Sequence, residues 1–171
     1  MVEISKLSKR YCVCKLKEED INEVYNLCKE NTLFYKYCPP FVSLEGIKED
    51  MVALPPNKTM KDKYYIGFYD GKILVAVMDL ILRYPNDNTI FIGFFMMKKS
   101  LHNNGIGSSI INEVLDYLKE CGFKYARLGW VEGNKQAENF WKKNEFIETG
   151  VKSKTDEYTI VVGERKLSRM N

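Results

Sequence analysis

Long apolar runs are missing from the 171-residue sequence. The longest one, residues 73–82, is interrupted by Asp79 and is too short to cross a bilayer, and residues 1–11 lack the hydrophobic segment of a signal peptide. Basic clusters are scarce, because lysine and arginine are interleaved with acidic residues and the formal net charge is only +3. We therefore expect a globular cytoplasmic protein, with no membrane or nucleic-acid partner indicated.

Residues that bind metal ions are also few. The sequence has a single histidine, His102, and its five cysteines form no C-x-x-C motif. Cys12 and Cys14 would share one face of a strand, but His102 is the only imidazole that could join them. We therefore expect no metal site, and we interpret the cysteines as small buried residues in a reducing compartment.

Two common phosphate-binding motifs are missing, but another glycine-rich turn is present. The sequence has neither G-x-x-x-x-G-K-[ST] nor G-x-G-x-x-G with an acid about twenty residues on. Instead, the apolar residues 90–97 lead through two lysines to Gly105 and Gly107, and an apolar stripe then predicts a helix that ends near Gly122. The first turn of this helix carries no acid, so its free N–H groups could bind an anion such as phosphate. A tight strand-to-helix connection is the alternative interpretation.

Two motifs in this region resemble those of a known family. Residues 102–107, HNNGIG, are similar to the [QR]-x-x-G-x-[GA] signature of the GNAT superfamily of acyl-CoA-dependent N-acetyltransferases. Residues 134–146 resemble the second motif of that family, N-x-x-A-x-x-F-[YW]-x-x-x-G-F. The motifs have the family's order and separation, so the resemblance covers nearly the whole chain. It implies transfer of an acetyl group from acetyl-CoA to a primary amine, by direct attack in a ternary complex.

The pattern of the remaining segments fits one domain over residues 1–171. We expect strands at residues 11–17, 63–69, 72–82, 90–97, 125–131, 147–154 and 157–165. We expect helices after Glu18, after Ser43, from residue 106 and over residues 135–143, with residues 34–41 as an aromatic, proline-stiffened link. This order predicts an α+β fold with a mixed, largely antiparallel sheet, helices on both faces, and a parallel strand pair around the glycine-rich helix. The GNAT fold has the same order.

The resemblance also implies which residues hold the cofactor. The pyrophosphate would lie on the backbone N–H groups of the glycine-rich turn, and the pantetheine arm would pair with the end of the preceding strand. A backbone N–H at Met96 or Met97 would donate to the thioester oxygen. Asn134 matches an asparagine that contacts the cofactor in the family, and it could also cap the next helix. The residues expected to bind the cofactor are Phe95, Met96, Met97, His102, Asn103, Asn104, Gly105, Ile106, Gly107, Ser108, Asn134 and Trp141.

Three positions depart from the family motifs. His102 replaces the usual Gln or Arg, either as a surface residue or as a pH-sensitive contact to a phosphate. Trp141 replaces the tyrosine that protonates the leaving thiolate in many relatives, and an indole has no acidic proton. Glu145 replaces the glycine before Phe146, so we expect Asn144 to adopt the left-handed conformation that ends the helix.

The motifs do not supply a general base. Residues 90–97 contain no carboxylate, whereas Asp79 interrupts an apolar strand. Asp79 could be a base or a contact for the substrate ammonium, or else a hydrogen-bonded core acid or an edge-strand charge. Gly93 indicates a bulge or a close backbone approach in its strand, with simple relief of packing as the alternative.

The acceptor substrate is predicted only by class. In the family the pocket lies where this chain has residues 34–41 and 154–157, and their aromatic and acidic side chains suit a small cationic amine. Acetylation of a protein or peptide is one alternative, and a catalytically silent acyl-CoA-binding module is another. The oligomeric state, monomer or homodimer, is left open.

Overall fold

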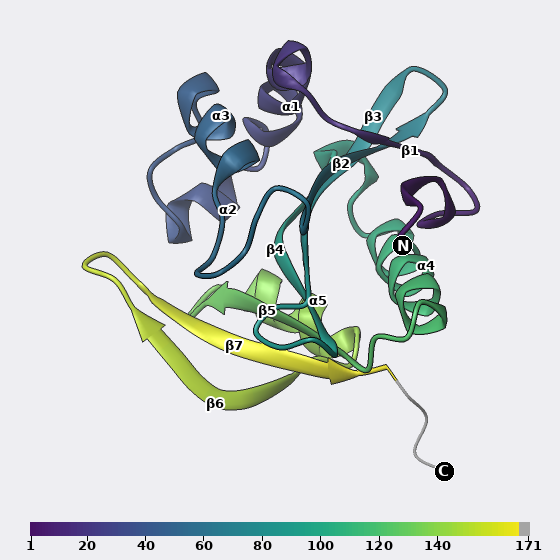
Figure 1. The fold of residues 1–171 in the computed structure, drawn as a ribbon. Helices are drawn as coiled ribbons and strands as arrows, with labels where there is room; N and C mark the ends of the chain where they lie inside the picture. Colours follow the sequence, from purple (N-terminus) through teal and green to yellow (C-terminus); the bar gives the residue numbers. More distant parts are fainter. Residues whose placement is uncertain (168–171) are drawn as a thin grey trace.

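The computed structural model describes residues 1–167, which contain a seven-stranded sheet (Figure 1). The strands are β1 (Cys12–Lys15), β2 (Lys63–Asp70), β3 (Ile73–Leu82), β4 (Thr89–Met97), β5 (Tyr125–Val131), β6 (Ile147–Lys154) and β7 (Thr159–Lys166). Their order is β1-β2-β3-β4-β5-β7-β6, and among these strands only β4 and β5 pair in parallel. The predicted α+β fold with a mixed, largely antiparallel sheet is confirmed.

Helices cover both faces of the sheet, as predicted. The helices α1 (Ile21–Cys28), α2 (Thr32–Tyr37) and α3 (Leu44–Val52) lie on one face, and α4 (Ile106–Glu120) and α5 (Lys135–Lys143) lie on the other (Figure 1). The short 3-10 helices η1 (Ile4–Lys6), η2 (Glu18–Asp20) and η3 (Lys99–Leu101) precede β1, α1 and α4. In the part of the chain that the structure describes, no helix is long and apolar enough to cross a membrane.

Strand alternation explains the two apolar layers. Successive side chains of a strand point to opposite faces, so Phe95 and Met97 of β4 join the core beneath α4 and α5. Phe94 and Met96 join the core beneath α1, α2 and α3. β4 therefore contributes to both cores, and its position at the centre of the sheet fixes it firmly. At the end of α4, Gly122 has φ +99, so the predicted left-handed helix stop is confirmed.

The helix α2 was not predicted. Residues 34–41 are predicted as an aromatic, proline-stiffened link without a helix, and this prediction is wrong for residues 34–37, which belong to α2. The helix has only six residues and none of them is buried, so it shows no helical apolar stripe in the sequence. Contacts between its aromatic side chains and distant residues hold it in place instead. Smaller differences are a shorter first strand and a last strand that begins at Thr159 rather than at Glu157.

The interpretation of the cysteines as buried is wrong for most of them. Only Cys28 is buried, Cys38 is half-buried, and Cys12, Cys14 and Cys121 are exposed. The reason for the first pair is that β1 is an edge strand, so helices cover the face of its two cysteines incompletely. Within residues 1–167, no cluster of three or more His, Cys, Asp or Glu side chains could hold a metal ion.

Candidate active site

The strands β4 and β5 separate part-way along the sheet. They pair from Thr89 to Ile92 of β4, and beyond Ile92 no described residue of β4 pairs with β5. β5 continues beside β7 as far as Val131, while β4 continues to Met97. The backbone of residues 93–97 therefore has an open edge on the β5 side, to which an extended ligand could add as a further strand.

A bulge in β4 lies at the point of separation. Asp79 of β3 pairs with Phe94 and Leu80 pairs with Ile92, so Gly93 is an extra residue between them. A Cβ atom at Gly93 would lie only 2.8 Å from Oδ2 of Asp79. The predicted bulge is confirmed, and the close neighbour of this glycine is the Asp79 carboxylate rather than a backbone segment, so Gly93 also relieves packing, as the alternative interpretation holds.

The register shows which backbone groups face the open edge. The N–H of Lys98 donates to the carbonyl of Val75 on β3 at 2.9 Å. Backbone groups of successive residues in a strand point to opposite sides, so those of Met96 point towards β3 and those of Phe95 and Met97 point towards the open edge. Of the two residues considered for the oxyanion donor, Met97 has its N–H on the open side and Met96 does not.

The turn before α4 presents a row of free backbone N–H groups. Gly105 is the N-cap residue, with φ +72, and the first helical bond runs from the N–H of Ser109 to its carbonyl. In the described chain, the N–H groups of residues 103–108 have no hydrogen-bond acceptor, and the first turn of α4 has no acidic side chain. A Cβ atom at Gly105 would meet nothing within 4 Å. This turn therefore fits a phosphate group, with room for it and donors to hold it.

The predicted turn residues differ in their exposure. Asn103, Asn104 and Gly105 are exposed, whereas Ile106 and Ser108 are half-buried. The side chain of Ser108 accepts a hydrogen bond from Nδ2 of Asn144 at 3.1 Å, which ties the end of α5 to the turn. These residues therefore contribute mainly their backbone to a ligand at the turn.

Gly107 brings the start of α4 against β4 and α5. A Cβ atom there would lie 2.8 Å from Sδ of Met97 and 3.2 Å from the ring of Phe140. The ring of Phe95 lies 6.1 Å, between centroids, from the rings of both Phe140 and Trp141. Trp141 is 8% exposed and belongs to the core beneath β4. A contact between its indole and the cofactor stays a prediction.

His102 folds back onto the end of β4. Its Nε2 lies 3.2 Å from the carbonyl oxygen of Met97, and because a carbonyl only accepts, Nε2 carries the proton in this bond. Asn31, just after α1, donates through Nδ2 to the same carbonyl at 3.1 Å and to that of Leu27 at 3.0 Å. The sequence gives no sign of this role for Asn31, because its partner lies 66 residues away. Together these bonds join α1, β4 and the turn.

Both ends of α5 carry an asparagine. The Oδ1 of Asn134 accepts from the N–H of Ala137 at 3.2 Å, so its predicted role as a cap is confirmed and its amide NH₂ group remains available. The left-handed conformation expected at Asn144 is found at Glu145 instead, with φ +66. Asn144 is buried because its side chain donates inward, to the carbonyl of Phe140 at 2.8 Å as well as to the turn.

Asp79 forms a buried ion pair with Lys63. The Nζ of Lys63 lies 2.8 Å from both carboxylate oxygens of Asp79. The side chain of Lys63 is 1% exposed and that of Asp79 is 15% exposed. Burial raises the pKa of Asp79, and Lys63 opposes this rise. β3 lies between β2 and β4, so the edge-strand interpretation is wrong and that of a hydrogen-bonded core acid is confirmed. A role as a base stays a prediction, which the raised pKa and the bulge beside it favour.

Aromatic side chains of α2 pack over β4 beside the bulge. Phe34 meets Phe94 edge-on with ring centroids 5.8 Å apart, and Tyr35 lies 4.9 Å from Phe34. Tyr35 in turn packs against Phe41 at 5.3 Å. These contacts form an aromatic wall on the same face of the sheet as Asp79.

The two segments expected to line the acceptor pocket approach each other. Interaction with the thiol of Cys38 and then burial raise the pKa of Tyr158, in the β6–β7 connection, to about 12. The tip of this hairpin lies on the α2 side of the molecule (Figure 1). Asp156 and Glu157 at the tip are exposed, so their charges are available to a ligand.

An open strand edge that leads to a row of free N–H groups defines a site for an extended ligand ending in phosphate, as in acyl-CoA transferases. Residues 21–146 match the model of the acetyltransferase (GNAT) family. The chain therefore belongs to the GNAT family, whose members are acetyl-CoA-dependent acyltransferases. No curated protein sequence matches the chain.

Solved structures of low sequence identity share the fold. An acetyltransferase from Thermus thermophilus has a TM-score of 0.72 at 15% identity, covering 91% of this chain and 96% of that one. Spermidine N-acetyltransferase from Vibrio cholerae, in complex with CoA and spermine, has a TM-score of 0.68 at 15% identity over 94% and 97%. The ribosomal-protein-S18-alanine N-acetyltransferase from Escherichia coli has a TM-score of 0.65 at 11% identity over 94% and 96%. The fold is thus shared by enzymes with small-molecule and with protein substrates.

Proposed function

We propose that this protein acetylates the primary amine of a small, cationic molecule, with acetyl-CoA as the donor and both substrates bound together. The observation that carries this proposal is the open edge of β4, beside which lies the start of α4, a helix without a side-chain cap. Acetyl-CoA supplies a thioester whose carbonyl an amine can attack without a covalent intermediate on the protein. No residue of this chain is required to act as a nucleophile.

The turn residues bind the pyrophosphate in this proposal. The N–H groups from Asn103 to Ser108 have no acceptor in the described chain, and the left-handed Gly105 has open space beside it. The N–H groups of Phe95 and Met97 hold the pantetheine arm and the thioester oxygen, because their register directs them to the open edge. We therefore favour Met97 over Met96 as the oxyanion donor among the two residues considered.

Asp79 is our candidate for the group that receives the amine proton or holds the substrate ammonium. It faces the bulge at Gly93, and its raised pKa brings it closer to the range useful to a base. Both of its oxygens accept from Lys63, so proton transfer would pass through an intervening water or follow a shift of this ion pair. Trp141 provides no acidic proton, and we assign the leaving thiolate no protein acid.

The walls around the acceptor side favour a small amine. The aromatic rings of α2 close one side of this region, and the exposed Asp156 and Glu157 add negative charge at another. A cationic amine gains from both, through cation–π contacts and through charge attraction. The Vibrio cholerae neighbour bound to spermine has the same fold, in agreement with this proposal.

The test is a panel of amines offered with acetyl-CoA, read by mass spectrometry of the products. The panel contains polyamines, amino sugars, free amino acids and peptides with free N-termini. We expect acetylation of at least one small cationic amine at a far higher kcat/KM than of any peptide. Turnover of peptides alone would replace this proposal by protein acetylation. Acetyl-CoA binding without transfer to any amine would indicate a catalytically silent binding module.

A further inference from the structure

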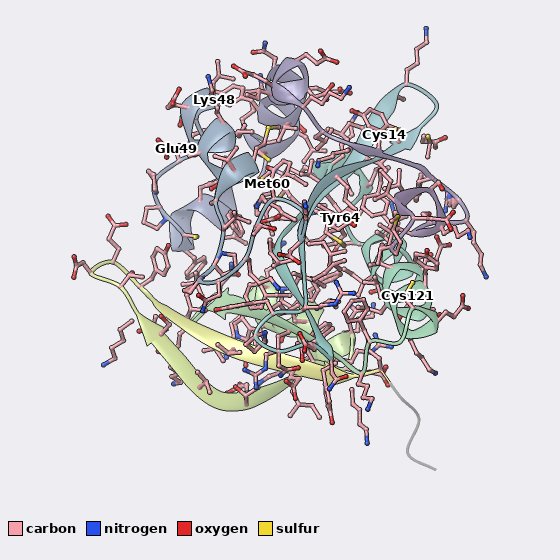
Figure 2. The ribbon with its side chains drawn as sticks, viewed as in Figure 1. Cys14, Lys48, Glu49, Met60, Tyr64 and Cys121 are labelled. Atoms are coloured by element: carbon pink, nitrogen blue, oxygen red, sulfur yellow. The ribbon has the colours of Figure 1, made fainter. Side chains whose placement is uncertain are left out.

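Two exposed thiols of β1 lie next to each other on one face of the sheet. Cys12 and Cys14 are two residues apart, so strand alternation points both the same way, while Val13 between them is buried in the core. Their Sγ atoms are 3.8 Å apart, and both residues are exposed. Figure 2 shows Cys14 at the β1 side of the molecule, far from Cys121 near the end of α4.

The thiol pair is separate from the proposed acetyl-transfer site. Across the sheet Cys14 is in register with Gly67, Val77 and Met96. Three strand spacings, roughly 14 Å, therefore separate it from the end of β4. A ligand at the thiols would not need to contact the open edge of that strand.

The surroundings exclude a closed metal-ion site. The thiols lie in a shallow hollow of about 440 Å³ that Asp20, Glu23 and Tyr69 also line. The hydroxyl of Tyr69 donates to Glu23 at 3.1 Å, so that carboxylate already has a partner. Over residues 1–167 no group of three ligating side chains exists, whereas structural zinc needs four ligands. A ligand that binds in this hollow must therefore be held by bonds to the two sulfur atoms alone.

The separation of the sulfur atoms favours a bent centre over a linear one. With bonds of about 2.3 Å, as in zinc thiolates, a linear S–M–S unit would need sulfur atoms about 4.6 Å apart, and a bent unit near the tetrahedral angle about 3.8 Å. The observed 3.8 Å fits the bent arrangement. Trivalent arsenic is pyramidal with a lone pair, so its S–As–S angle is somewhat below the tetrahedral one and the two exposed sulfur atoms need only a small further approach. Two sulfur ligands plus one further substituent complete its coordination.

We propose that Cys12 and Cys14 form a binding site for trivalent arsenic compounds, namely arsenous acid and mono-organic arsenic(III) oxides. With a mono-organic arsenic(III) oxide, two S–H bonds and the arsenic–oxygen bonds break, two As–S bonds form, and the two protons leave with the oxygen as water. With arsenous acid, two S–H bonds and two of the As–OH bonds break, two As–S bonds form, and each proton leaves with a hydroxyl as water, so that one hydroxyl stays on the arsenic. Arsenic stays trivalent and the sulfurs are not oxidised, so no oxidant or reductant is involved. The second As–S bond closes a ring within the protein, so a pair binds about a hundredfold or more tighter than one thiol.

The probe is phenylarsine oxide, added to the reduced full-length protein in the presence of excess glutathione as a competing monothiol. Native mass spectrometry would then count the phenylarsenic groups that remain bound. Wild type is compared with Cys12→Ser, Cys14→Ser and the matched control Cys121→Ser, whose cysteine is also exposed. Circular dichroism checks that each exposed substitution leaves the fold intact.

We expect one retained group in wild type and in Cys121→Ser, and an apparent affinity at least a hundredfold lower in each of the two β1 variants. Retention by Cys12→Ser or by Cys14→Ser would overturn the proposal, as would loss of the group in Cys121→Ser. Absence of binding to wild type would overturn it as well. The readout does not depend on acetyl transfer, so it is independent of the proposed function.

Discussion

At the scale of single residues, the Lys63–Asp79 pair holds two charges inside an apolar sheet. The lysine has no other carboxylate bonded to it in the described chain, and its side chain is 1% exposed. Such a pair contributes little net stability, but removing one partner leaves the other charge buried and uncompensated. A mutation of Asp79 therefore has a structural consequence that must be separated from any catalytic one.

Asp79→Asn is expected to lower the free energy of unfolding by about 3–5 kcal/mol, because it leaves the Lys63 ammonium buried without a charged partner. Urea unfolding at pH 7 measures this change. The double variant Lys63→Met, Asp79→Leu removes both charges and should recover most of the loss. A single variant as stable as wild type would show that Lys63 finds another partner. The role of Asp79 as a general base is tested only by the rate of acetyl transfer of an Asp79 variant that is shown to be folded.

The raised pKa of Asp79 also predicts the sign of a pH effect. The unfolded carboxyl titrates near pH 3.9, about its ordinary value, and burial moves the folded pKa higher. Between the two values the folded state binds more protons, so the free energy of unfolding falls as pH rises through this window. Relative to the double variant, wild type should show this decline in urea unfolding at a series of pH values. A relative gain in stability across the window would contradict it.

His102 provides a second pH test. Its Nε2–H donates to Met97 in the neutral ring and in the imidazolium alike, so protonation leaves this bond intact. We expect the affinity for acetyl-CoA to stay constant between about pH 5.5 and 8, measured by calorimetry. His102→Gln keeps a side-chain donor and serves as the control without an imidazole. An affinity that falls as pH rises in wild type only would show that the imidazolium contacts a phosphate.

At the scale of elements, α2 packs over the face of β4 on which we propose that the acceptor amine binds. Phe34 reaches Phe94 on β4, whereas the neighbouring Leu33 is 40% exposed. Phe34→Ala should raise KM for the amine several-fold and leave the acetyl-CoA affinity unchanged, because the ring packs on the face of β4 that we assign to the acceptor in our proposal. Steady-state kinetics and calorimetry measure the two quantities. Leu33→Ala is the matched control, and an equal effect of both variants would contradict this assignment.

The sequence predicts those elements whose signals are local. The stripe of α4 follows from periodicity, the Gly93 bulge from a glycine inside a strand, and the stop at Gly122 from a glycine that can adopt a positive φ. The helix α2 could not be predicted, because its contacts are long-range and its own residues show no stripe. Asn31 was missed for the same reason. The exposure of Cys12 depends on β1 being an edge strand, which only the sheet order reveals.

At the scale of the whole molecule, the sheet holds β4 between two apolar cores and leaves one stretch of its edge free. Both cores fix the strand, and the bonds from Asn31 and His102 anchor its last carbonyl. The start of α4 lies beside the end of this strand, because Gly107 packs against Met97, so the donors of the strand edge and of the turn form one track with η3 between them. This track is the basis for placing acetyl-CoA on the protein.

The most direct test is a calorimetric titration of acetyl-CoA into wild type, Gly105→Glu and Gly71→Glu. Both glycines have positive φ, +72 and +59, and a Cβ atom at either would meet nothing within 4 Å, so the backbone strain of the two substitutions is comparable. Gly71 lies in the β2–β3 turn and has no part in the track. We predict that wild type and Gly71→Glu bind equally, and that Gly105→Glu binds at least about tenfold more weakly, a loss of about 1.4 kcal/mol or more. Equal binding by all three proteins would contradict the placement of the pyrophosphate on this turn.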